Sequence, residues 1–211
     1  MPEEKDKQIK SKERVAKHGE VYTNEREVNA MLDLVKNETE RIDSRFLEPA
    51  CGNGNFLVKI LERKLNIVTN KYKKKQTDWE FYSLFALSSI YGIDILEDNC
   101  EECRLRLLEI YNNTYISFFH NKIKQECLVI AKYLLEKNII CGDALNLKTS
   151  ANKDIAFAEW SFVYPDKVKR IDYTMRNLIS AEPNTLFPNA EAVQEFPLTN
   201  FLKIQKEYEN N

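Results

Sequence analysis

One stretch of the chain, Phe46 to Phe56, constrains its fold more than any other. It reads Phe-Leu-Glu-Pro-Ala-Cys-Gly-Asn-Gly-Asn-Phe, so an apolar start runs into a turn with two glycines and then into residues with helical spacing. This order predicts a strand, a tight loop and the first turn of a helix. In α/β proteins such a loop binds nucleotide-like ligands, because glycine lets the backbone turn sharply and approach a ligand closely. Leu57 stands where a dinucleotide-binding G-x-G-x-x-G would have its third glycine.

The size and composition of the chain fit one globular domain with a real core. Its 211 residues are 43% hydrophobic and 30% charged, as is usual for such domains. The net charge of −2 creates no overall basic field for nucleic acid. The sequence has no apolar run of membrane-spanning length, and residues 1–17 lack the apolar region of a signal peptide. We expect a cytoplasmic protein without membrane contact, whose contacts with nucleic acid are local or supplied by a partner.

The five cysteines are expected to be reduced thiols, because their number is odd and the chain has no export signal. Cys100 and Cys103 form a CxxC, followed by His120 and Cys127. A structural metal site needs four converging ligands, whereas this pair lies on a predicted helix with no second CxxC. We therefore interpret the pair as buried structural thiols and expect no metal.

Strand-like and helix-like segments alternate along the chain, which predicts an α/β fold with βαβ units and a parallel sheet. The predicted strands are residues 45–47, 90–95, 138–143 and 154–162, and the predicted helices begin after Asn24, a candidate N-cap, and then span residues 56–65, 79–90, 97–112 and 120–137. We expect residues 1–18 to be a flexible charged tail, residues 19–182 to be one domain, and residues 183–211 to be an irregular tail.

Two acidic residues, Asp94 and Asp143, end the second and third predicted strands. Right-handed crossovers place the loops after parallel strands along one sheet edge, so both acids should lie beside the glycine loop. That loop can offer backbone N–H groups to a charged ligand tail. Asp94 can accept hydrogen bonds from both hydroxyls of a ribose, and Asp143 can accept one from the exocyclic amine of adenine. Each acid alone could instead cap the next helix; together with the loop they predict a site for S-adenosylmethionine.

Several segments resemble, in sequence order, motifs of the amino-group DNA methyltransferases. Residues 48–56 are similar to Asp-Pro-(Ala/Pro)-Cys-Gly-x-Gly-x-Phe/Leu, with Glu48 in place of Asp. Residues 92–95 resemble motif II of that family, and residues 142–145 resemble its motif III. Residues 18–24 resemble the segment G-E-x-[FY]-T-P, which caps the methionine end of the cofactor, with Asn24 where Pro is usual. This order is that of the gamma-type adenine methyltransferases and of the modification subunits of restriction systems.

The resemblance implies a class I S-adenosylmethionine-dependent methyltransferase fold, which is Rossmann-like, with a reduced and mostly parallel sheet. It also implies that S-adenosylmethionine is the cofactor, with Glu48 and Thr23 near its methionine end. Cys51 has no apparent partner base and is interpreted as a packing residue. The implied cofactor-binding residues are Thr23, Glu48, Pro49, Gly52, Asn53, Gly54, Asp94, Ile95, Asp143 and Ala144.

The catalytic motif of that family is missing from the chain. Family members end the fourth strand in Asn/Asp-Pro-Pro-Tyr/Phe, which orients the target amine and stacks an aromatic ring on the flipped base. At the corresponding distance after Asp143 stand Glu159 and Phe162. We take both as catalytic candidates, because a Glu can accept a hydrogen bond from an amine and a Phe can stack. The alternative is that Trp160 and Phe162 pack under the sheet.

The residues after the fourth predicted strand read poorly as strands, so that strand is expected to have an exposed edge. The edge could be covered by residues 196–204, by a second copy of the chain or by another subunit. Lys167, Lys169 and Arg170 form a small basic group that could contact phosphate or could be a solvated face.

The sequence thus predicts an S-adenosylmethionine-dependent DNA methyltransferase-like protein of the adenine-N6 type, related to restriction–modification subunits. Its expected partners are DNA, reached directly or through another subunit, and a second protein or a second copy of the chain. The alternatives are a non-catalytic subunit that binds the cofactor or serves assembly, and an enzyme that methylates a small molecule or a protein.

Overall fold

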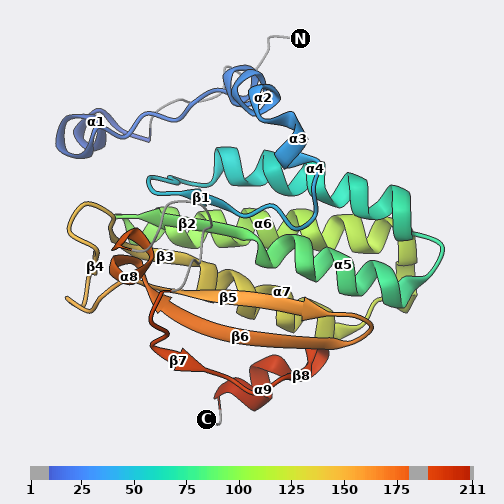
Figure 1. Ribbon diagram of the computed structural model, residues 1–211. Helices are drawn as coiled ribbons and strands as arrows, with labels where there is room; N and C mark the ends of the chain where they lie inside the picture. Colours follow the sequence, from blue (N-terminus) through green and yellow to red (C-terminus); the bar gives the residue numbers. More distant parts are fainter. Residues whose placement is uncertain (1–9, 181–189, 210–211) are drawn as a thin grey trace, which may run out of the picture.

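The computed structural model describes residues 10–180 and 190–209 of the chain. Figure 1 shows long helices alongside a small parallel sheet, with a two-stranded hairpin on the other side of the molecule. The helices are α1 (Lys12–His18), α2 (Glu25–Leu34), α3 (Lys36–Thr39), α4 (Asn55–Tyr72), α5 (Gln76–Ser88), α6 (Glu97–Phe119), α7 (Gln125–Asn138), α8 (Met175–Ser180) and α9 (Ile204–Glu209), with short 3-10 turns η1 (His120–Lys122) and η2 (Phe201–Lys203).

The first sheet contains three parallel strands in the order β1 (Phe46–Glu48), β2 (Ile90–Asp94) and β3 (Ile139–Asp143). A short antiparallel strand, β4 (Lys148–Thr149), pairs with β3. The three predicted parallel strands are therefore confirmed, each within one residue of its observed start. Glu48 pairs with Gly92 and Asp94 with Cys141, so the ends of β1, β2 and β3 lie along one edge of the sheet.

Two pairs of helices connect these strands and form most of the core. Helices α4 and α5 lie between β1 and β2 in the chain, and α6 and α7 lie between β2 and β3. Helix α4 buries Leu57, Ile60, Leu61 and Leu65, all at most 3% exposed. Cys100 and Cys103 of α6 are fully buried in the same core, as the interpretation of structural thiols requires.

The N-terminal segment differs in part from its prediction. Asn24 does cap α2, because its Oδ1 accepts a hydrogen bond from the backbone N–H of Glu27 at 2.9 Å. The predicted tail, however, contains a helix: α1 is capped by Ser11, its Arg14 pairs with Asp98 of α6, and Lys10 before it pairs with Glu102. Residues 1–9 of that predicted tail lie outside the described residues.

The segment predicted as a fourth strand of the parallel sheet does not join it. Residues Ala156–Val163 form β5, which pairs antiparallel with β6 (Lys167–Thr174) over its whole length. The physical reason is local: only three residues separate the two strands, so the hairpin closes with little loss of chain entropy. Two short strands of the C-terminal segment, β7 (Gln194–Glu195) and β8 (Thr199–Asn200), cover β6.

The hairpin packs across the second face of the parallel sheet and reaches the helices. Tyr91 and Ile93 of β2 contact Ile155 and Phe157 in one buried cluster, and the Tyr91 hydroxyl donates to the Ala158 carbonyl at 2.8 Å. The Ile155 N–H bonds the Leu147 carbonyl near the end of β3. Strand β5 starts at this edge and runs toward the starts of β1 and β2, opposite in direction to the parallel strands (Figure 1).

The C-terminal segment, predicted to be irregular, is packed against this hairpin. Phe196, Phe201 and Ile204 are at most 6% exposed, so the candidate cover within the chain does protect a sheet edge, that of β6. The predicted basic group is divided: Arg170 is buried and pairs with Asp172 at 2.6 Å, while Lys169 pairs with Glu195. Residues 183–189 of the predicted tail lie outside the described residues.

No helix in the described part of the chain is long and apolar enough to cross a membrane.

Candidate functional site

A cavity of about 300 Å³ lies where β1 and β2 end. Three segments form its walls: residues 19–23 before α2, the glycine loop at residues 48–56, and the turn from β2 into α6 at residues 94–99. Six of the predicted cofactor-binding residues line it, namely Thr23, Glu48, Gly52, Asn53, Asp94 and Ile95. The structure therefore brings together residues that are far apart in the sequence.

Asp94 connects two walls of this cavity. Its Oδ2 accepts a hydrogen bond from the backbone N–H of Gly52 at 2.9 Å, and its Oδ1 accepts one from Leu96 at 2.9 Å. The Asn99 amide donates to the same Oδ1 at 3.2 Å. The carboxylate of β2 thus fixes the glycine loop after β1 and still has one lone pair, on Oδ2, for a ligand.

Both glycines of the loop are required by their backbone conformation. Gly52 has φ +52° and Gly54 has φ +89°, values that side chains disfavour. A Cβ on Gly52 would also lie 3.2 Å from the Tyr22 ring, and a Cβ on Gly54 would lie 2.6 Å from the Cys103 Sγ. Tyr22 therefore rests directly on the loop, and α6 packs directly behind it.

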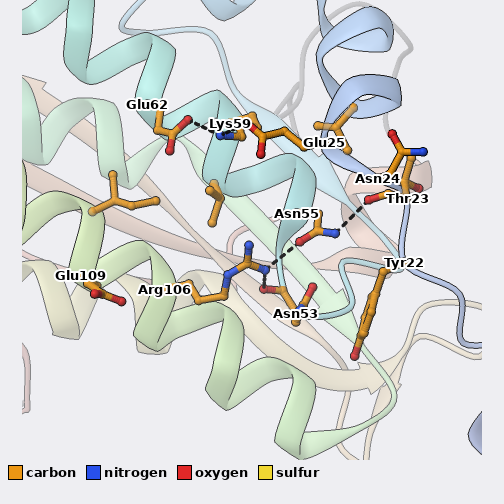
Figure 2. Close-up of a pocket in the computed structure, with 13 residues that line it drawn as sticks. Tyr22, Thr23, Asn24, Glu25, Asn53, Asn55, Lys59, Glu62, Arg106 and Glu109 are labelled. Atoms are coloured by element: carbon orange, nitrogen blue, oxygen red, sulfur yellow. Dashed lines mark hydrogen bonds and ion pairs between the residues drawn. The ribbon is translucent and has the colours of Figure 1, made fainter. Parts of the chain in front are cut away.

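A second cavity, of about 360 Å³, lies behind the loop between α2, α4 and α6. Figure 2 shows Asn53, Asn55 and Arg106 converging there. Arg106 donates to the Asn53 carbonyl at 2.7 Å and to the Asn55 Oδ1 at 2.8 Å, and the Asn55 amide donates to the Thr23 carbonyl at 2.9 Å. This chain of bonds joins α6, the glycine loop and residues 19–23. The Asn53 Oδ1 is buried and has no hydrogen-bond partner among the described residues.

Glu20 is a buried carboxylate at the edge of the first cavity. Arg14 binds it through both carboxylate oxygens, at 2.5 and 2.8 Å, and the Asn99 amide donates to it at 2.7 Å. The hydrogen bonds from Arg14 lower the pKa of Glu20 to about 2. The Tyr22 hydroxyl also donates to Glu20, at 3.0 Å, and burial raises the pKa of Tyr22 to about 12. Glu20 is therefore ionised and Tyr22 protonated at neutral pH.

Sequence reasoning missed three polar residues of this region, Arg14, Asn99 and Arg106. It gave no separate role to Glu20, which lies in the segment 18–24 that resembles the cap of the methionine end. Asp98, Asn99, Glu102 and Arg106 follow one another on one face of α6 at helical spacing. A polar stripe of this kind usually faces solvent, so spacing alone did not assign it to the site. The order of the glycine loop and of Asp94 in the sequence carries no information about this stripe.

Four predicted cofactor residues do not line the first cavity. Pro49 is exposed in the turn after β1, and Gly54 is buried as the N-cap of α4. Asp143 lies at the same sheet edge, at the end of β3, where its oxygens accept from the Leu145 N–H at 2.8 Å and the Asn146 amide at 2.9 Å. Ala144 packs against the apolar cluster on the second face of the sheet.

The two catalytic candidates lie away from the glycine loop. Glu159 accepts a hydrogen bond from Arg45 at 2.7 Å, at the start of β1, while the loop follows the end of that strand. Phe162 packs against Phe81 and Phe85, with ring centroids 5.3 and 5.2 Å apart. The packing alternative for Phe162 is therefore the one that the structure supports, because β5 runs in the direction opposite to the prediction.

The cysteines near the loop are suited to packing. Cys51 is 6% exposed, and its contact with Cys103, together with burial, raises the pKa of its thiol. A thiol whose pKa is raised is a poor nucleophile. All five cysteines are free, and the described residues contain no cluster of His, Cys, Asp or Glu that could hold a metal ion.

Comparison with known proteins finds a distant similarity to a curated protein. The chain is similar to the Methanocaldococcus jannaschii protein named "Putative type II restriction enzyme and methyltransferase RM.MjaORFECS2P", with 29% identity over 131 residues. The match covers 59% of this chain and 10% of that protein, so the chain spans about a tenth of its relative's length. No protein-family model matches the chain, and no solved structure matches it.

Proposed function

We propose that this chain is the S-adenosylmethionine-binding part of a DNA methyltransferase of the adenine-N6 type, from a restriction–modification system. One observation carries the proposal: the Asp94 carboxylate is bonded to the Gly52 N–H at the wall of a cavity that Tyr22 and Thr23 close from the other side. In parallel α/β sheets this edge is where nucleotide-like ligands bind. The distant similarity to a protein named as a restriction enzyme and methyltransferase agrees with it.

The residues of the cavity fit the parts of this cofactor. The N-terminus of the 18-residue helix α4 has no side-chain cap, so its free N–H groups suit the carboxylate of the methionine end. The Asn53 Oδ1 is a buried acceptor that no described residue bonds, and it suits the ammonium group, as does the Glu48 carboxylate. Asp94 retains one lone pair, on Oδ2, for a ribose hydroxyl, and Ile95, which is 56% exposed, offers an apolar surface to adenine.

S-adenosylmethionine supplies an electrophilic methyl group when it is bound, and this chain's residues hold and orient it. In the proposal Thr23 and Glu48 face the methionine end. Asp143 and Ala144 follow the neighbouring strand and contact the cofactor only if the adenine reaches β3. The proposal also includes DNA as the substrate. A protein partner, or a second copy of the chain, recognises the target sequence.

A second function has one observation in its favour. Glu159 and Phe162 lie near the start of β1, bonded to Arg45 and packed on α5, and the chain lacks the Asn/Asp-Pro-Pro-Tyr tetrapeptide. A non-catalytic subunit that binds S-adenosylmethionine and requires another polypeptide for the transfer step would have this arrangement.

Calorimetry with S-adenosylmethionine tests the proposal. We expect binding by the purified chain and a loss of affinity of at least about tenfold, or 1.4 kcal/mol, in Asp94→Ala. The matched control is Asp43→Ala, since Asp43 is an exposed carboxylate paired with Arg41. Thermal unfolding checks that both variants fold. An absence of binding by the wild-type chain refutes the proposal.

Tritiated methyl transfer to mixed DNA, with and without the neighbouring gene products, separates the two functions. Transfer by the chain alone supports the enzyme. Binding without transfer under every condition supports the non-catalytic subunit.

A further inference from the structure

The wall of the first cavity that contains residues 19–23 belongs to a longer segment, residues 10–23, which we call the strap. It contains α1 and the residues that lead from α1 to α2. Among the strap side chains that the structure describes, Glu20 alone is buried, and the others are half-buried or exposed. The strap therefore contributes no apolar side chain to the core.

The other two walls are anchored differently. The glycine loop continues into α4 through Leu57, and the turn after β2 continues into α6 through Cys100, and both residues are fully buried. Burial of a large apolar side chain stabilises an element by about 1.5–3 kcal/mol. The strap lacks this contribution, so it is the wall that detaches most readily.

Ion pairs hold the strap to the first two turns of α6. Arg14 pairs with Asp98 at 2.7 Å and with Glu20 at 2.5 Å, and Lys10 pairs with Glu102 at 2.7 Å. The Asp98 side chain is 52% exposed. Pairs that are this accessible to solvent are weakened by salt. Arg14 is the central group, because it contacts both α6 and the buried carboxylate of the strap itself.

Gly19 is the C-cap of α1 and the first residue of the strap that lines the cavity. It has φ +65°, and a Cβ added to it would find no atom of residues 10–180 or 190–209 within 4 Å. The side of the backbone that would bear a Cβ is therefore open at this point. Beyond it, Tyr22 lies on Gly52 and donates through its hydroxyl to Glu20 and Asn99, so movement of the strap uncovers the glycine loop.

We propose that the strap is a salt-sensitive gate over the cofactor cavity and that Arg14 is its latch. This inference rests on the proposed function, because the gated ligand is S-adenosylmethionine. A cofactor held between the strap and the glycine loop leaves when the pairs of Arg14 break and residues 19–23 move away. Loss of the latch increases the dissociation rate of the cofactor and exposes the backbone of residues 20–23.

Hydrogen exchange of the protein without cofactor tests the latch. We expect Arg14→Gln to increase exchange in residues 20–23 by about tenfold, equivalent to 1.4 kcal/mol, and 0.5 M NaCl to do the same in the wild type. Residues 57–65 of α4 serve as the internal reference. The matched control is Arg41→Gln, which removes an exposed pair with Asp43 and should leave residues 20–23 unchanged. Unchanged exchange in Arg14→Gln overturns the gate.

Stopped-flow dissociation of S-adenosylmethionine tests the gating itself. We expect about tenfold faster dissociation from Arg14→Gln than from the wild type or Arg41→Gln, with little further increase in high salt. Equal dissociation rates overturn the gate and leave the proposed function intact. Failure of the wild type to bind S-adenosylmethionine overturns the proposed function instead, and the exchange experiment still reports whether the latch exists.

Discussion

Two glycines with the same backbone requirement but different surroundings allow the packing behind the loop to be measured. Gly19 and Gly54 both have positive φ, +65° and +89°. An alanine at Gly19 would have open space, whereas an alanine at Gly54 would place its Cβ 2.6 Å from the Sγ and 3.3 Å from the Cβ of Cys103. Cys103 is fully buried in α6, so it cannot move aside into solvent.

The expected free energies of unfolding follow from these contacts. Alanine in the left-handed region costs about 1–2 kcal/mol, and this term applies to both Gly19→Ala and Gly54→Ala. The effect of a glycine-to-alanine change on the unfolded chain is also common to both. Overpacking adds about 1–3 kcal/mol at Gly54 alone. We therefore expect Gly54→Ala to lose about 1–3 kcal/mol more than Gly19→Ala, measured by urea unfolding followed by circular dichroism.

A double mutant identifies the atom responsible. Cys103→Ala removes the Sγ that lies closest to the added methyl group, so Gly54→Ala should be less destabilising in the Cys103→Ala background, by about 1 kcal/mol. Equal losses for the two glycine variants, or strict additivity in the double mutant, would refute the reasoning that α6 packs directly against the loop.

Three further predictions concern buried polar groups. Burial lowers the pKa of Lys64 from 10.5 to about 7, so between these pH values the unfolded chain holds a proton that the folded chain lacks. The unfolding free energy of the wild type, relative to that of Lys64→Met, should therefore rise by about 1.4 kcal/mol per pH unit over pH 7.5–9.5. A difference that does not change with pH contradicts this. Trp160→Phe removes the bond from Nε1 to the Asn138 Oδ1 at 2.9 Å and should cost about 1–3 kcal/mol in urea. Lys124→Met leaves the fully buried Glu80 carboxylate without the cation that lies 2.6 Å from it. The melting temperature of this variant should fall by several degrees, for a loss of about 3 kcal/mol. Adding Glu80→Gln to Lys124→Met should recover part of that loss.

The parallel strands and the glycine loop could be predicted because their signals are local. The stretch from Phe46 to Phe56 contains its own strand, turn and helix start, and Asn24 identifies the start of α2 by capping alone. Asp94 was assigned to the loop because parallel strands must end at one sheet edge, and its bond to Gly52 bears out that proximity.

The hairpin could not be predicted from the same kind of signal. Residues 156–163 have the apolar content of a strand, but that content does not determine which strand they pair with. The pairing depends on β6, whose Arg170 and Asp172 read as exposed charges. They are compatible with this strand because they bond each other at 2.6 Å, while Arg170 lies against the Phe196 ring. The positions of Glu159 and Phe162 follow from that pairing, which places them away from the glycine loop.

The strap and the polar face of α6 were missed for a related reason. Arg14, Asp98 and Glu102 resemble the charges of any solvated surface, and their assignment depends on which segments the fold places opposite one another. Sequence spacing predicts contacts within a helix. These ion pairs instead join residues far apart in the sequence, since Arg14 and Asp98 are 84 positions apart.

The two sheets also differ in how far apart in the chain their partners lie, which has a consequence for the order of folding. Val163 pairs with Lys167, so the hairpin can form from a very short loop. In the parallel sheet, Phe46 pairs with Ile90 and Gly92 with Ile139, and two helices separate the partners in each case. Loop closure of that length is slower. The glycine loop acquires its shape only when β1 meets β2, so the ligand cavity should be among the last parts of the molecule to mature, after the hairpin and the long helices have formed.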